Sequence, residues 1–208
     1  MTLIVHHLEN SRSQRVLWML EELELPYEVR RYARDPKTML APPELKRVHP
    51  LGKSPVLEDG GAVLAETGAI VEYLVEKADG RLGPPVHRDA ILRYRHFLHY
   101  AEGSLMPPLL LMLVIQRLGL LGRPARARVQ AMIDGHLDWL EAELAGRDWF
   151  VGDALTAADV MMSFPLEAAR QRAGLDRSRP KLIAWLDRIH ARPAYARALA
   201  KGGPYAFA

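Results

Sequence analysis

The sequence has no cysteine among its 208 residues. A chain without thiols cannot build a disulfide framework or a cysteine-ligated zinc site, and it cannot use a cysteine of its own as a nucleophile. The absence fits a reducing compartment. The first ten residues, "MTLIVHHLEN", also lack the basic region and cleavage site of a signal peptide, so we expect a cytoplasmic protein.

Long apolar runs and an excess of one charge are also missing. The longest apolar run, Leu105–Ile115, contains two prolines and is shorter than the ~20 residues that cross a bilayer, so we expect no membrane span. Basic residues exceed acidic ones by only three. The densest basic cluster, "RPARAR" (residues 123–128), has no interleaved aromatics, and we interpret it as a solvent-exposed helix face. We therefore expect neither a nucleic acid nor a membrane as a partner.

The first third of the chain alternates between strand and helix patterns. The apolar periodicity predicts strands at 2–7 and 27–32, helices at 11–23, 42–50 and 66–79, and a β-hairpin over 54–65. The hairpin turn is Asp59-Gly60-Gly61, whose glycines tolerate positive φ. The resulting order is βαβαββα, which indicates a small α/β domain over residues 1–79.

The remainder of the chain shows only helical patterns. Residues 80–86, which include "GRLGPP", read as a linker, and residues 87–208 as an all-helical domain. Helices are predicted at about 87–117, 124–144, 157–170, 181–191 and 194–200. Thr156 and Asp159 have the spacing of a capping box at the start of the third of these helices.

Two segments and their order resemble the glutathione transferase superfamily, in particular its cytosolic, bacterial-type members. The segments are "HPLGKSPVLEDGGAVLAETGAIVEYL" (residues 49–74) and "FVGDALTAADVMMSF" (residues 150–164). The resemblance covers essentially the whole chain. It implies a thioredoxin-like first domain with a cis peptide bond before Pro55, a helical second domain, a cytoplasmic homodimer, and a role in detoxification with glutathione as co-substrate and no metal.

The resemblance also assigns residues to glutathione. Ser54 would pair its main chain with the cysteinyl part, as an added strand does. Glu66 and Thr67 would hold the ammonium and carboxylate of the γ-glutamyl end. Lys53 and His49 would face the glycyl carboxylate.

The strip "LENSRSQR" (residues 8–15) has two readings. Ser11 and Gln14 have capping-box spacing, which is a purely structural role. In serine-type relatives, however, a serine four residues before an arginine donates its hydroxyl to the glutathione sulfur, and Ser11 and Arg15 fit that spacing. Cysteine-type relatives place their cysteine one position earlier, where this chain has Asn10. Ser11 and Asn10 are therefore alternative candidates for the catalytic donor.

The second substrate would be a hydrophobic electrophile. Its expected wall comes from the first helix of the second domain and from the C-terminal tail: Tyr100, Met106, Leu109, Met112 and Tyr205, with Phe207 as an alternative to Tyr205. Three functions remain open: a transferase that attacks the electrophile with the glutathione thiolate, a glutathione-dependent isomerase or peroxidase, and a non-catalytic relative that serves as a binding or assembly module.

Overall fold

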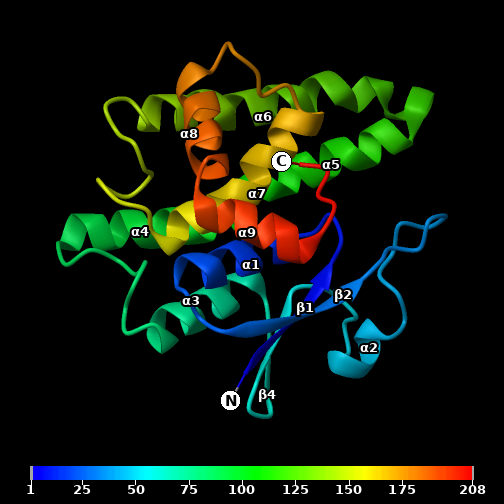
Figure 1. Cartoon of the computed structure of the whole chain (residues 1–208). Helices are drawn as coiled ribbons and strands as arrows, with labels where there is room; N and C mark the ends of the chain where they lie inside the picture. The colour runs from blue at the N-terminus through cyan, green and yellow to red at the C-terminus, as the bar shows by residue number, and fades with distance from the viewer. Residues whose placement is uncertain (1, 208) are drawn as a thin grey trace. The chain divides into compact units, whose positions relative to one another are not determined.

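The computed structural model describes residues 2–207, which form two compact units (Figure 1). The first unit comprises the chain up to Gly83 together with residues 190–206. The second comprises residues 84–189 and Phe207. The last helix therefore belongs to the first unit, whereas the helical pattern of residues 87–208 predicts it in the second.

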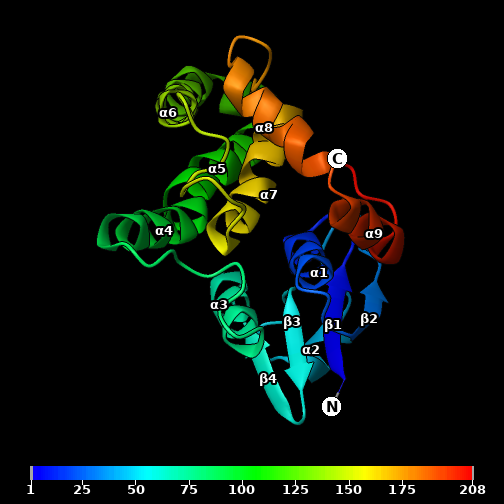
Figure 2. The same ribbon diagram turned by 60° about the vertical axis from the view of Figure 1, so that its left-hand side comes forward.

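A four-stranded sheet is the centre of the first unit (Figure 2). Its strands are β1 (Leu3–Leu8), β2 (Tyr27–Tyr32), β3 (Val56–Asp59) and β4 (Ala62–Ala65), in the order β2-β1-β3-β4. β1 runs parallel to β2, whereas β3 is antiparallel to both β1 and β4. The parallel pair is possible because a helix connects β1 to β2.

The helices of this unit are α1 (Ser13–Glu22), α2 (Leu45–Val48), α3 (Thr67–Lys77) and α9 (Pro193–Gly202). Every residue of α1 from Ser13 to Glu21 is buried. A helix buried on all sides needs a covering element on each face, and α9 covers one of them. The Trp18 and Tyr195 rings meet edge to face at 5.5 Å across this contact.

Ion pairs also join α9 to α1. The buried carboxylate of Glu21 accepts from Arg197 at 2.7 Å and pairs with Lys201 at 2.6 Å. Arg192 holds both carboxylate oxygens of Glu22, at 2.5 and 2.7 Å. The net effect of these donors is a lowered pKa for Glu21, although burial acts in the opposite direction. The pairing of α9 with α1 thus explains why the last helix belongs to the first unit.

The second unit is helical over the part of the chain that the structure describes. Its elements are α4 (Arg88–Tyr100), the π-helical turn η1 (Ala101–Leu105), α5 (Met106–Arg117), the 3₁₀ turn η2 (Gly119–Gly122), α6 (Arg123–Glu143), α7 (Ala157–Arg172) and α8 (Pro180–His190). The sequence predicts one regular helix over 87–117, and the π turn departs from that expectation. Pro107 and Pro108 lack amide hydrogens and would crowd the carbonyls one turn earlier, and a widened turn relieves both problems.

The continuous helix Arg88–Arg117 is long and apolar enough, by length and composition, to cross a membrane. About half of its most apolar window is buried inside the protein, as in a core helix. The predicted capping box at the start of α7 is confirmed. The Asp159 carboxylate accepts from the Thr156 amide at 3.0 Å, from the Thr156 hydroxyl at 2.8 Å and from the Phe150 amide at 2.9 Å.

Candidate functional site

One edge of the sheet in the first unit gathers three segments far apart in sequence. β1 ends at Leu8, and the polar turn of residues 9–12 follows it. In the ladder, His6 lies opposite Val56, and Val56 lies opposite Ala65. The residues just before β3, Ser54 and Pro55, and those just after β4, Glu66 and Thr67, therefore lie at the same edge as that turn.

The Ser54–Pro55 peptide bond is cis, the geometry that the family resemblance implies. The Ser54 hydroxyl donates to the His6 carbonyl at 2.8 Å and accepts from the Leu8 amide at 3.1 Å. The Ser54 side chain thus provides hydrogen-bond partners for main-chain groups of β1 at the point where the pairing of β1 with β3 ends. The main chain of Ser54 lies outside the ladder, in the bend just before β3, so the β1–β3 pairing leaves it open to a peptide ligand.

Helix α3 begins at this edge with a strained residue. Glu66 has φ of +70°, a conformation uncommon for a side chain other than glycine, and its side chain is exposed. Its carbonyl accepts from the Ile70 amide at 3.0 Å, and Thr67 is buried as the first helical residue. The start of a helix attracts anions, so this corner can hold a carboxylate while Glu66 offers a partner to an ammonium group.

The turn after β1 is also held in an unusual conformation. Asn10 has φ of +50°, and its side-chain oxygen accepts from the Ala206 amide at 2.7 Å. Arg34 fixes the same turn by donating to the carbonyls of Glu9 at 3.0 Å and Asn10 at 3.3 Å. Because its oxygen already has a donor, Asn10 has its amide hydrogens to offer to a ligand.

Ser11 lies at the end of a buried hydrogen-bond chain. Its hydroxyl is 2.7 Å from the Ser13 hydroxyl, which is 2.9 Å from Nδ1 of His7. The Ser13 amide donates to the Ser11 hydroxyl oxygen at 3.3 Å. Ser11 is 6% exposed and the other two side chains are less exposed still, so water competes little for these hydrogen bonds.

The protonation state of His7 decides which group donates and which accepts along this hydrogen-bond chain. Burial, and then the charge of Arg31, lower its pKa to about 4, although a hydrogen bond with the Gly202 main chain and the charge of Glu9 act the other way. The imidazole is therefore neutral near pH 7. The hydrogen bond with the Gly202 main chain raises the pKa of His7, so the ring must donate it from an N–H group. Nε2 is the ring nitrogen next to Gly202, and it therefore carries the hydrogen.

With its hydrogen on Nε2, neutral His7 accepts the Ser13 hydrogen at Nδ1. Ser13 can then accept the hydrogen of Ser11. Ser11 therefore turns its hydrogen inward, toward Ser13, and its hydroxyl must rotate before it can donate to a ligand. Sequence reasoning missed His7 and Ser13 in this role. The signal available was the alternation of β1, which turns His7 to the opposite face of the sheet from His6.

The capping box expected from Ser11 and Gln14 is wrong. The α1 N-cap is Arg12 and has no side-chain capping bond, and Ser11 binds the Ser13 amide instead of that of Gln14. The Gln14 side chain is buried toward α9, where neither of its polar atoms has a partner among the described residues. Arg15 is 1% exposed, so it acts inside the unit and not at its surface.

The other candidate residues lie in different settings. Lys53 is exposed and His49 is half-buried, both on the segment between α2 and β3 that leads to Ser54. Met106, Leu109 and Met112 are buried in the core of the second unit. A wall for an electrophile built from these three residues stays a prediction.

The two tyrosines expected at the electrophile site differ from each other. The Tyr100 hydroxyl is 2.5 Å from Nδ1 of His136, and burial raises the pKa of Tyr100 to about 12. Tyr205 is half-buried in the C-terminal tail. No group of three His, Asp or Glu side chains within residues 2–207 is arranged to hold a metal ion.

Two family models match the chain. The model for the glutathione S-transferase N-terminal domain matches residues 11–77, and that for the C-terminal domain matches residues 123–188. Among curated relatives, glutathione S-transferase 3 of Schizosaccharomyces pombe is 35% identical, over 92% of this chain and 84% of that protein. Glutathione S-transferase 1 of Saccharomyces cerevisiae is 33% identical, over 92% of each chain.

Solved structures give the same result. A glutathione S-transferase from Actinobacillus pleuropneumoniae superposes with a TM-score of 0.90 at 36% identity, covering 99% of this chain and 95% of the other. A glutathione S-transferase from Methylobacterium radiotolerans, in complex with glutathione sulfonate, gives a TM-score of 0.79 at 28% identity, covering 99% and 96%.

Proposed function

The chain belongs to the glutathione S-transferase family and is a glutathione transferase, and from that premise we propose how its first unit holds and activates glutathione. The γ-glutamyl group binds at the start of α3, with its carboxylate at Thr67 and its ammonium at Glu66. The cysteinyl part pairs with the main chain of Ser54, preceding Pro55. The glycyl carboxylate faces Lys53 and His49. The observation that carries this proposal is the shared sheet edge of these segments.

The chemistry is activation of the bound thiol as a thiolate. A free thiol has a pKa near 8.5, and lowering it to about 6.5 requires ~2.7 kcal/mol of preferential stabilisation of the anion. One charge-assisted hydrogen bond contributes about 1.5–3 kcal/mol, so a single well-placed donor is enough. The thiolate then attacks an electrophilic carbon of a hydrophobic substrate.

Ser11 is our first candidate for this donor and Asn10 the second. Ser11 can donate to sulfur only after its hydrogen leaves Ser13, whereas its oxygen keeps the bond from the Ser13 amide. Asn10 can use its amide hydrogens without breaking its bond to Ala206. Arg15, which is buried, supports the turn from inside.

The test is the ultraviolet thiolate absorbance of glutathione bound to the protein, titrated with pH. We expect a bound pKa well below ~8.5 in the unsubstituted protein and a value near it in Ser11→Ala. Ser13→Ala is the matched control, because it removes the competitor for the Ser11 hydrogen and so leaves the thiol pKa equal or lower.

Other outcomes are equally clear. A loss confined to Asn10→Ala makes Asn10 the donor. Saturating binding of glutathione with no thiolate signal in any variant contradicts thiolate activation and favours the binding-module function.

We also propose a cytoplasmic homodimer that acts in detoxification, on the strength of family membership. Sedimentation velocity tests the dimer directly, since a single species at the mass of one chain contradicts it.

A further inference from the structure

The C-terminal tail of the chain returns to the turn that follows β1. Helix α9 ends at Gly202, and Gly203 turns the chain with φ of +84°, in the left-handed region that glycine adopts without strain. A β-carbon at Gly203 would also overlap the guanidinium group of Arg31, which lies on β2. The glycine therefore lets the chain pass beside β2 and reach Asn10, where the Ala206 amide donates to Oδ1 at 2.7 Å.

This hydrogen bond decides the orientation of the Asn10 carboxamide. A backbone N–H group can only donate, so the carboxamide atom beside the Ala206 amide must be the oxygen. The NH₂ group lies at the other end of the carboxamide, and it has no hydrogen-bond partner among residues 2–207. The Asn10 side chain is only half-buried, so both amide hydrogens can be offered to a ligand.

Arg34 holds the main chain of the same turn. Its guanidinium group donates to the carbonyls of Glu9 at 3.0 Å, Asn10 at 3.3 Å and Met39 at 2.9 Å. The Arg34 amide donates in turn to the Glu9 carboxylate at 2.8 Å. Because these bonds hold Asn10 at its φ of +50°, rotation of the Asn10 side chain is the freedom that remains, and the bond from Ala206 restricts it.

Asn10 and Ser11 differ in what they offer to a thiolate. The Ser11 hydroxyl directs its hydrogen to Ser13 and must rotate before it can donate outward. The Asn10 amide hydrogens need no such change. A donor that is already oriented stabilises a developing charge without the loss of side-chain freedom that ordering it would require. The tail thus gives Asn10 a property that Ser11 lacks.

We propose that the C-terminal tail positions Asn10 as a donor to the glutathione thiolate. The Ala206 main-chain amide and the Arg34 guanidinium are positioning groups, because they act on the thiol through Asn10. This inference rests on the proposed thiolate activation. It adds that ionisation of the bound thiol depends on a main-chain group close to the end of the chain.

The test follows the ultraviolet absorbance of the thiolate of bound glutathione against pH, with the full chain. A206P removes the donating amide hydrogen, whereas the conservative variant A206G keeps it. Asn10→Ala should raise the pKa of the bound thiol by about 1 unit, the size of one hydrogen bond to a charged group. A206P should raise it by about 0.5 unit or more, because the thiolate must then order the carboxamide itself. A206G should leave it within about 0.2 unit.

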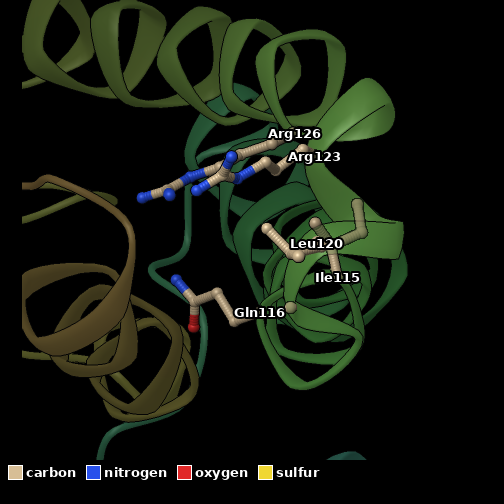
Figure 3. A pocket seen from close by; sticks show the side chains of 6 residues that line it. Ile115, Gln116, Leu120, Arg123 and Arg126 are labelled. Carbon is tan, nitrogen blue, oxygen red and sulfur yellow. The ribbon is translucent and has the colours of Figure 1, made fainter.

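Two further comparisons separate positioning from other effects. In the double variant N10A/A206P, the proline should add less than about 0.2 unit to the pKa of Asn10→Ala, since the tail acts through Asn10. R34K keeps the positive charge but loses the planar donor fork, so it should also raise the thiol pKa, by about 0.5 unit. Its control is R123K in the second unit, where the Arg123 side chain extends from the start of α6 beside that of Arg126 (Figure 3). That exchange should not move the thiol pKa.

The outcomes distinguish this inference from the proposed function. An unchanged thiol pKa in A206P, or an equal rise from A206P with and without Asn10, overturns the inference and leaves thiolate activation in place. No thiolate signal in the unsubstituted protein at saturating glutathione overturns both. If A206P lowers the thermal midpoint, deletion of residues 204–208 removes the same donor by another route, and an unchanged thiol pKa in that variant likewise overturns the inference.

Discussion

His7 couples the strand β1 to the candidate donor Ser11 while staying uncharged. Its ring contacts Ser13 through Nδ1 and the Gly202 main chain on the other side. A β-carbon at Gly202 would lie 3.3 Å from Nε2 and 2.8 Å from the Gln14 side-chain oxygen. Glycine at this position is what allows α9 to approach the ring.

The lowered pKa of His7 predicts a pH dependence of stability. In the unfolded chain the ring takes up a proton near pH 6.5, whereas burial and Arg31 delay this to about pH 4 in the folded chain. The unfolded state therefore binds the extra proton as the pH falls from 6.5 to 4, and the folded state loses up to about 3 kcal/mol over this window.

Urea denaturation at several pH values checks this prediction by comparing variants. The loss of unfolding free energy over this window should be smaller in His7→Gln than in the unsubstituted protein. His99→Gln, on an exposed part of α4, should lose as much as the unsubstituted protein. Equal pH dependence in all three proteins would exclude His7 as the source.

At the scale of an element, α7 depends on the capping box at its start. Asp159 is fully buried, and burial raises its pKa even though the Phe150 and Thr156 donors oppose the shift. Asp159→Ala would leave the amides of Phe150 and Thr156 buried without acceptors. We expect a loss of about 3 kcal/mol or more in unfolding free energy, since each such group costs about 1–3 kcal/mol.

Thr156→Ala keeps the carboxylate and should lose only about 1 kcal/mol, the usual value of an N-cap residue. Asp153→Ala, in the exposed loop before α7, is the control and should change the unfolding free energy by less than about 0.5 kcal/mol. If Asp153→Ala and Asp159→Ala behaved alike in chemical denaturation, the capping box would not be the cause.

At the scale of the whole molecule, the first unit is assembled from both ends of the chain. Without residues 190–206, the Trp18 face of α1 loses its covering ring, and the carboxylates of Glu21 and Glu22 lose their ion-pair partners. We predict that residues 1–83 alone lack a cooperative unfolding transition, and that adding a peptide of residues 190–208 restores one.

Trp18 fluorescence and near-ultraviolet circular dichroism measure this recovery. The control peptide carries Tyr195→Ala, which removes the ring against Trp18 and should reduce the recovery strongly. A fragment of residues 1–83 that unfolds cooperatively by itself would show that α9 is dispensable.

The sequence predicted most elements because their signals are local. The hairpin around Asp59–Ala62 carries its own turn residues, and the capping box at Thr156 and Asp159 spans only four residues. The α/β and helical halves differ in periodicity, which predicted the fold class. The resemblance of residues 49–74 likewise led to Ser54, Pro55, Glu66 and Thr67.

Other features depend on contacts that no local pattern encodes. The membership of α9 in the first unit rests on pairs such as Glu22–Arg192, which are distant in sequence. The direction in which the Ser11 hydroxyl donates its hydrogen depends on His7 and Gly202. The capping box expected at Ser11 and Gln14 does not form because the Gln14 side chain is buried toward α9. The sequence by itself determined the elements and their order, because propensity and periodicity are properties of neighbours. Only the tertiary structure decided which helix covers α1 and which way the buried hydrogen bonds run, because those depend on residues brought together from opposite ends of the chain.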